Sequence, residues 1–232
     1  MIETPNIILY FLLGNITLKY LLNYIFNIEL TKQSFYSSLF MSLFITYFRK
    51  PINYDLTYIL SQNEDDYTCI QLQFCLLVYL YEDLLFSKNN KSLIFHHIEC
   101  ISGLLISLNL NICVGYLNNS LSNEISTIFL NIYILLKKKQ NKTLSIIKNI
   151  SFILFYITFI LYRIIILTKL NYIIFYENIE LFKTIYPIYS SFLFVNSFSH
   201  LILQYYWFLK INNILYKQIM NVYMENIQLY KK

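Results

Sequence analysis

Charged residues are scarce in this chain of 232 residues: Asp, Glu, Lys and Arg make up 13%, against about 25% in an average soluble domain. A soluble domain of this length needs more charge than that to cover its surface. Disorder is excluded as well, because hydrophobic types make up 57% of the sequence. Collagen-like, propeller and loop-rich β folds need glycine and proline, of which the chain has 3 each. The composition therefore indicates an integral membrane protein.

Cysteine and histidine motifs are also scarce. The 4 cysteines show no CxxC or ordered spacing and lie in apolar stretches, so we interpret them as core residues. With 3 histidines, the multi-histidine di-iron sites of membrane hydroxylases cannot be built. We expect no metal and no cofactor, although a mononuclear zinc site of His96, Cys100 and a carboxylate stays open. The net charge of +5 comes from basic residues between apolar segments, which membrane topology explains better than nucleic-acid binding.

Seven apolar stretches approach the roughly 20 residues that a helix needs to cross a bilayer. They are residues 5–28, 34–48, 68–86, 93–108, 111–136, 143–168 and 186–211, and counts of six or eight spans stay open. The first stretch lacks the basic start and the small-residue cleavage site of a signal peptide, so we interpret it as a membrane anchor. The sequence predicts an all-α integral membrane protein with about seven spans.

The basic residues predict the orientation of the chain. With seven spans and a cytosolic C-terminus, twelve of the 18 Lys and Arg residues fall in cytosolic segments and four on the opposite side. Because cytosolic loops carry an excess of Lys and Arg, this distribution favours an outer N-terminus and a cytosolic C-terminus. The acidic run at residues 64–66 then lies on the non-cytosolic side.

Polar residues inside the predicted spans are the candidate functional residues, because ionisable groups are costly in a bilayer. Helical spacing arranges them in three stripes, each on one span. The stripes are His96, Cys100, Gly103 and Ser107; Glu124, Thr127 and Asn131; and Asn196, His200, Gln204 and Trp207. We expect the three stripes to converge on one internal cavity that handles a substrate or an ion.

Simpler roles compete at several of these positions. Asp83 lies near a membrane edge and is also explained as part of a solvated helix end. Arg163 is explained equally well as a structural counter-ion of Glu124. For His200 we favour packing and hydrogen bonding over catalysis, and for Trp207 a place in the interface belt or the core.

The adjacent histidines His96 and His97 have no such simple explanation, because their neighbours are mostly Ile, Leu and Phe. Imidazole is a general base near neutral pH and can accept an acyl group. Glu124 or Asp83 would orient it, and Glu99 lies one helical turn away, either as a partner of His96 or facing headgroups. Adjacent helical residues point about 100° apart, so the two rings cannot easily share one metal ion.

Several short segments resemble the TLC domain family, which includes the ceramide synthases. The matching text is YLYEDL at 79–84, IFHH at 94–97, NEISTIFLN at 123–131 (with Ile128 in place of a proline), LYRI at 161–164 and YWFLKI at 206–211. The resemblance covers residues 34–217. It implies a six-helix membrane barrel around a lipid-sized cavity, preceded by an N-terminal transmembrane helix at 1–33 and followed by a cytosolic tail at 218–232.

The resemblance also implies roles for residues. The histidine pair of ceramide synthases catalyses N-acylation of a sphingoid base by acyl-CoA, which implies that His96 and His97 are catalytic with Glu124 as their partner. The synthases' longer motif is not intact, because Asn123 stands at its histidine, Glu124 at its first aspartate and Thr127 at its second. The departure favours the non-synthase branch of the family, which is linked to membrane lipid composition.

The sequence thus predicts a lipid-handling protein of the endoplasmic reticulum, acting in membrane lipid homeostasis or in sphingolipid and acyl-lipid metabolism. An N-acyltransferase with acyl-CoA as co-substrate is the alternative, and a small-solute transporter is a further one. Membrane lipids are the expected partners, nucleic acid is not, and a homodimer stays open. The residues predicted to line the cavity, besides the catalytic three, are Asp83, Cys100, Gly103, Thr127, Asn131, Arg163, His200, Gln204 and Trp207.

Overall fold

The computed structural model describes residues 6–21, 24, 30–60, 67–86, 90–110, 112–137 and 142–230, and within these ranges every regular element is a helix. The predicted all-α fold class is confirmed. The acidic run at 64–66, and residue 111 at the predicted start of the fifth span, lie outside the described residues.

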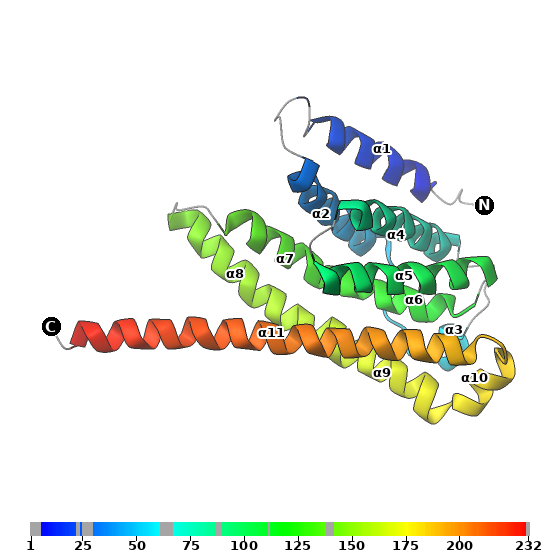
Figure 1. Cartoon of the computed structure of the whole chain (residues 1–232). Coiled ribbons are helices and arrows are strands. Elements are labelled where there is room, and N and C mark those ends of the chain that lie inside the picture. The colour runs from blue at the N-terminus through cyan, green and yellow to red at the C-terminus, as the bar shows by residue number, and fades with distance from the viewer. Residues whose placement is uncertain are drawn as a thin grey trace.

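The predicted spans correspond to helices in chain order, as Figure 1 shows. Two short helices, α3 and α10, lie in connections between them. The elements are α1 (Ile7–Tyr20), α2 (Leu30–Phe48), α3 (Leu56–Ile59), α4 (Tyr67–Phe86), α5 (Lys91–Leu110), α6 (Val114–Ser120), η2 (Leu121–Asn123), α7 (Glu124–Leu136), α8 (Lys142–Thr158), η3 (Phe159–Ile166), α9 (Leu167–Tyr172), η4 (Ile173–Glu177), α10 (Ile179–Ile185) and α11 (Ser190–Tyr230).

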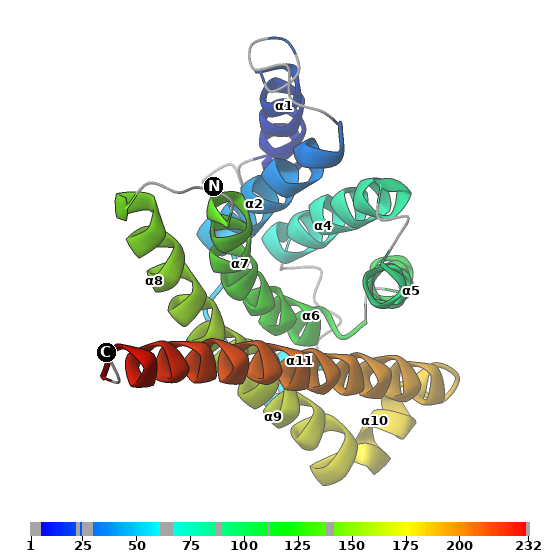
Figure 2. The ribbon, with the colours of Figure 1, turned by 60° about the vertical axis from the view of Figure 1, so that its left-hand side comes forward.

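Six helical units pack in a closed order. Helix α5 packs against α4, α4 against α2, α2 against α7 and α7 against α8. Helix α11 closes the order, because it packs against both η3 and α5. Helix α1 stands at the outer edge of the bundle beside α2 and α4 (Figure 2). The fold is therefore a six-helix bundle with one additional N-terminal helix.

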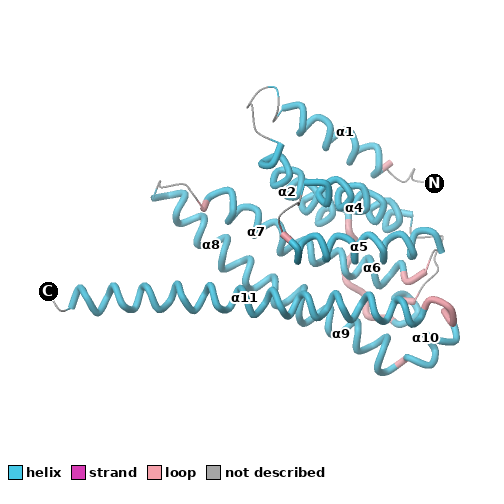
Figure 3. Tube along the Cα trace, in the orientation of Figure 1, coloured by secondary structure: helices cyan, strands magenta, loops and turns pink. Residues whose placement is uncertain are grey.

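Three spans differ from their predicted form. The sixth does not end at Thr168 but continues through α9 and η4 to Glu177. The fifth is interrupted by a 3₁₀ turn, η2, where the polar run at 118–123 lets side chains bond to the backbone: Ser122 Oγ donates to the Asn119 carbonyl oxygen at 2.6 Å. The seventh does not end at Ile211 but continues as α11 to Tyr230, projecting past the other helices (Figure 3). No Gly or Pro follows Pro187, so nothing in the sequence interrupts this helix.

Large apolar side chains are exposed on the outside of the bundle, and its interior holds polar side chains as well as three clusters of buried apolar residues. One face of the long helix from α8 into η3 exposes only large apolar side chains at helical spacing: Ile146, Ile150, Ile153, Ile157, Leu161 and Ile165. Gln71, Gln73, Ser42, Ser126 and Gln204, in contrast, are fully buried. Three described helices are long and apolar enough to cross a membrane on their own, namely 68–85, 91–110 and 142–177.

Gly115 lets the start of α6 approach α3 closely. A Cβ atom built on Gly115 would lie 2.0 Å from the carbonyl oxygen of Tyr58, which is backbone and cannot move aside cheaply. We expect Gly115→Ala to destabilise the protein by about 1–3 kcal/mol, the usual cost of overpacking. Gly103→Ala is the matched control, because its Cβ would meet only the Asn196 side-chain oxygen, at 3.1 Å. Thermal unfolding in detergent tests this, and equal melting temperatures for the two variants would contradict it.

Candidate functional site

A cavity of about 100 Å³ lies inside the bundle, between α5, α6, α7, η3 and α11. Each predicted polar stripe contributes to its wall, so the expected convergence of the stripes is observed. The polar or small side chains in the wall are His96, Cys100, Gly103, Tyr116, Ser120, Asn123, Glu124, Arg163, Asn196, Ser197 and His200. The resemblance implied a lipid-sized cavity, but this one is smaller than the roughly 300–1,000 Å³ of typical ligand pockets.

His96 faces the cavity. Its Nδ1 lies 3.5 Å from the Cys100 sulfur, one helical turn along α5. The centroid of its ring lies 5.1 Å from that of His200 and 5.1 Å from that of Trp207, which covers the ring edge-on. The imidazole is thus held by ring contacts and a thiol, and it has no carboxylate partner among the ion pairs of the described residues.

His97 points away from the cavity. Its Nε2 lies 3.4 Å from Oδ2 of Asp83 on α4, and both side chains are more than nine-tenths buried. The other ring nitrogen, Nδ1, is buried and has no hydrogen-bond partner in the part of the chain that the structure describes. The two histidines therefore occupy different environments, as the 100° angle between adjacent helical positions predicts. Of the two, only His96 is a cavity residue.

Glu124 and Arg163 bring opposite charges into the same cavity. Oε2 of Glu124 accepts a hydrogen bond from the Ser42 hydroxyl at 2.9 Å. The guanidinium of Arg163, 8% exposed, donates from Nε to Ser126 Oγ and from Nη2 to Thr127 Oγ1, each at 2.7 Å. Neutral oxygens thus hold Arg163 in place, and Glu124 is not within ion-pair distance of it. If Arg163 is the counter-ion of Glu124, it acts across the cavity and not through a direct ion pair.

Arg163 lies where its helix widens into the π-helical segment η3. Such segments are rare and occur frequently at functional sites. Its Nη1 also reaches Gln204 Oε1 on α11, at 3.4 Å. The helix that carries Arg163 is therefore tied to α7 and to α11 by one side chain.

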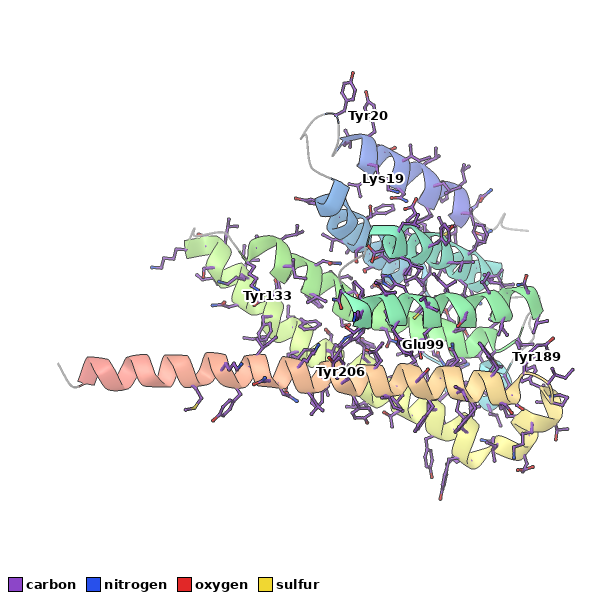
Figure 4. The ribbon with its side chains drawn as sticks, viewed as in Figure 1. Lys19, Tyr20, Glu99, Tyr133, Tyr189 and Tyr206 are labelled. Atoms are coloured by element: carbon purple, nitrogen blue, oxygen red, sulfur yellow. The ribbon has the colours of Figure 1, made fainter. Side chains whose placement is uncertain are left out.

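A chain of contacts continues from Gln204 along α11. Gln204 Nε2 lies 3.2 Å from His200 Nε2, and His200 Nδ1 lies 3.2 Å from Oε2 of Glu99 on α5. The Ser199 hydroxyl donates to the other oxygen of Glu99. Glu99 is 5% exposed and lies between α5 and α11 (Figure 4), so its partner is His200 rather than His96 or headgroups.

The predicted site residues divide into three groups. Those that line the cavity are His96, Cys100, Gly103, Glu124, Arg163 and His200. Those that hold lining residues from behind are Thr127 and Gln204, both bonded to Arg163, and Trp207, packed on His96. Those outside the wall are His97 and Asp83, which pair with each other, and Asn131, which donates to Ser38 Oγ at 2.9 Å.

Sequence patterns did not predict four polar residues of the wall. Ser197 lies on α11, while Tyr116, Ser120 and Asn123 follow one another at i, i+4 and i+7 and line the cavity from α6 and η2. This spacing is a usable signal, but the polar neighbours Asn118 and Asn119 obscure it. Asn123 is 7% exposed, and its side-chain oxygen has no hydrogen-bond partner among the described residues. A buried acceptor without a partner in a cavity wall is a place for a ligand donor.

One comparison with known proteins gives a match. The family model of the TLC domain matches residues 25–213, which covers most of the chain, from before α2 into α11. No match was found among curated proteins or among solved structures. The closed order of six helices and the matched range together establish that the chain is a multi-pass membrane protein that belongs to the TLC domain family.

Proposed function

We propose that this protein binds the polar end of a membrane lipid in the cavity and acts in membrane lipid homeostasis. We place it in the branch of the TLC domain family outside the ceramide synthases, because Asn123, Glu124 and Thr127 replace the polar residues of the synthase motif. The proposed location is the endoplasmic reticulum, on family likeness. The proposed orientation has the C-terminus in the cytosol, on the distribution of Lys and Arg.

The proposal rests on one observation: the cavity wall contains hydrogen-bond donors and acceptors that a ligand can use. Glu124 and the side-chain oxygen of Asn123 are adjacent acceptors in the wall. Arg163 lines the cavity and has five N–H groups, of which three donate to oxygens of the described residues, so two are left for a ligand. Acceptors and donors in one small space suit a headgroup that carries both an amine or hydroxyl and a carbonyl or phosphate oxygen.

The volume of the cavity decides which part of a lipid it holds. A buried water needs about 10–15 Å³ of such space, so about 100 Å³ takes several waters or one headgroup. A long acyl chain does not fit in it. The acyl chains of the ligand then lie against the apolar outer faces of the helices, and recognition depends on the polar end.

Lipid-dependent stabilisation of the purified protein tests the proposal. We expect one class among sphingoid bases, ceramides, phosphatidylethanolamine, phosphatidylcholine and fatty acids to raise the melting temperature by about 5–10 °C, the effect of a ligand near 100 times its Kd. Glu124→Gln should lose most of this rise. The control Glu82→Gln should keep it, because Glu82 pairs with Lys19 outside the cavity wall. Equal rises in both variants would contradict the proposal.

Acyl transfer is the second candidate, and one observation favours it. The His96 imidazole faces the cavity with no carboxylate at either nitrogen, which leaves it able to take a proton or an acyl group. Incubation with labelled acyl-CoA and amine acceptors tests this candidate. Formation of an N-acyl product that disappears in His96→Asn and persists in His97→Asn would establish it.

A further inference from the structure

Three metal-binding side chains meet in the cavity wall. His96 and Cys100 lie one turn apart on α5, and His200 faces them from α11. One ligand atom from each of the three lies within 4.8 Å of the others. Imidazole nitrogen and thiolate sulfur are the donors that Zn²⁺ prefers. A zinc site of His96, Cys100 and a carboxylate was the alternative at the sequence level, whereas in the structure the third side chain of the group is His200.

The distances fit a tetrahedral ion. With a Zn–S bond of about 2.3 Å and a Zn–N bond of about 2.0–2.1 Å, sulfur and nitrogen of a tetrahedral site are about 3.6 Å apart. The Cys100 sulfur lies 3.5 Å from His96 Nδ1 and 3.9 Å from His200 Nδ1. All three ligand atoms lie within 4.8 Å of one another, so they would have to move closer together to hold an ion between them.

The charges nearby also fit a divalent cation. A Cys100 thiolate and the Glu99 carboxylate, whose Oε2 is 3.2 Å from His200 Nδ1, would together neutralise a charge of +2 inside the bilayer. With Nδ1 of His200 on the ion, its Nε2 carries the proton and faces the Gln204 amide, 3.2 Å away. That amide would accept this hydrogen bond through its oxygen only after turning over, and it would then give up the contact of its Oε1 with Arg163 Nη1.

We propose that His96, Cys100 and His200 form a Zn²⁺ site whose remaining position faces the cavity. The proposal goes beyond lipid binding, because the ion would be an electrophile in the cavity. A headgroup oxygen or a water would occupy its remaining coordination position. On binding, the Cys100 thiol releases its proton to solvent and its sulfur bonds to the ion. The site is incompatible with acyl transfer by His96, because a metal-bound nitrogen has no lone pair for a proton or an acyl group.

Metal content of the purified full-length protein tests the site, with the affinity tag removed and after exposure to zinc and desalting. We expect about one zinc per chain by inductively coupled plasma mass spectrometry. Cys100→Ser and His200→Asn should each lower the content tenfold or more. The matched controls are Cys75→Ala, a buried cysteine outside the cavity wall, and His97→Asn, the histidine that faces Asp83, and both should keep the metal.

Replacement of the metal by cobalt gives a second readout that does not depend on lipid. A thiolate–cobalt(II) charge-transfer band in the near ultraviolet is expected for the wild type and for Cys75→Ala, and its absence is expected for Cys100→Ser. Each sample is confirmed as folded by size exclusion before measurement. Trace metal in the zinc-exposed wild type, or equal loss from Cys100→Ser and Cys75→Ala, would overturn the site.

The lipid-dependent shift, measured on the same preparations, separates the two proposals. If lipid raises the melting temperature but the zinc-exposed wild type contains no zinc, the metal site is overturned and lipid binding is supported. If the wild type contains zinc but lipid does not raise the melting temperature, the metal site is supported and lipid binding is overturned.

Discussion

Replacing Arg163 by glutamine is expected to have the largest effect on stability of any single change in the cavity. The variant removes the donors to Ser126, Thr127 and Gln204 and leaves Glu124 in the cavity without a nearby positive charge. Removing one member of a buried charge constellation costs about 3–5 kcal/mol. For a chain of this size that is a fall in melting temperature of roughly 10 °C or more.

Two further variants separate charge from geometry at this position. Arg163→Lys keeps the positive charge but cannot reach three oxygens with a planar fork, so we expect an intermediate loss. The double variant Arg163→Gln, Glu124→Gln should recover part of the stability, because the uncompensated carboxylate is gone. A melting temperature of Arg163→Gln within about 2 °C of the wild type, or no recovery in the double variant, would contradict this account of the cavity.

The second large effect is expected at His97. Its pairing with Asp83 is buried on both sides, so His97→Phe leaves the Asp83 carboxylate with one partner fewer in the bundle interior. Loss of a buried charge-assisted contact costs about 2–4 kcal/mol. His96→Phe removes only contacts to a thiol and to rings, so we expect it to cost about 1 kcal/mol or less in metal-free protein.

Melting temperatures measured with a metal chelator and without added lipid test this division of the histidine pair. Lipid-dependent stabilisation, added as a second measurement, should be lost in His96→Phe and kept in the folded fraction of His97→Phe. The opposite result would show that the assignment of the two rings is wrong. In that case His96→Phe would lower the melting temperature more than His97→Phe, and His97→Phe would lose the lipid-dependent stabilisation.

Helical spacing alone predicted much of this site. The stripes on residues 96–107, 124–131 and 196–207 meet at one cavity because residues three and four apart share a face of a helix. The same spacing placed His96, and not His97, on the cavity stripe, whereas the resemblance implied that both are catalytic. Spacing could not predict that His97 meets Asp83, because that depends on how α5 packs against α4.

Other features depended on contacts between distant segments. Glu99 lies one turn from His96 along α5, yet its partner is His200, 101 positions away in the sequence. Asn131 follows the spacing of Glu124 and Thr127, but α7 packs against α2 there and turns it toward Ser38. Two predicted ends were inaccurate: the helix of the sixth span continues past Lys169 to Glu177, and that of the seventh continues past Ile211 to Tyr230, because no helix breaker follows at either place.

Native mass spectrometry of the purified full-length protein tests the central claim most directly. The account predicts one tightly bound lipid of a single headgroup class per chain, retained through detergent exchange. It also predicts loss of that lipid when Ser120→Phe fills the cavity, but not when Leu105→Phe enlarges an exposed position on α5. A lipid-free wild type, or a lipid retained equally by both folded variants, would contradict the claim that the cavity binds the polar end of a lipid.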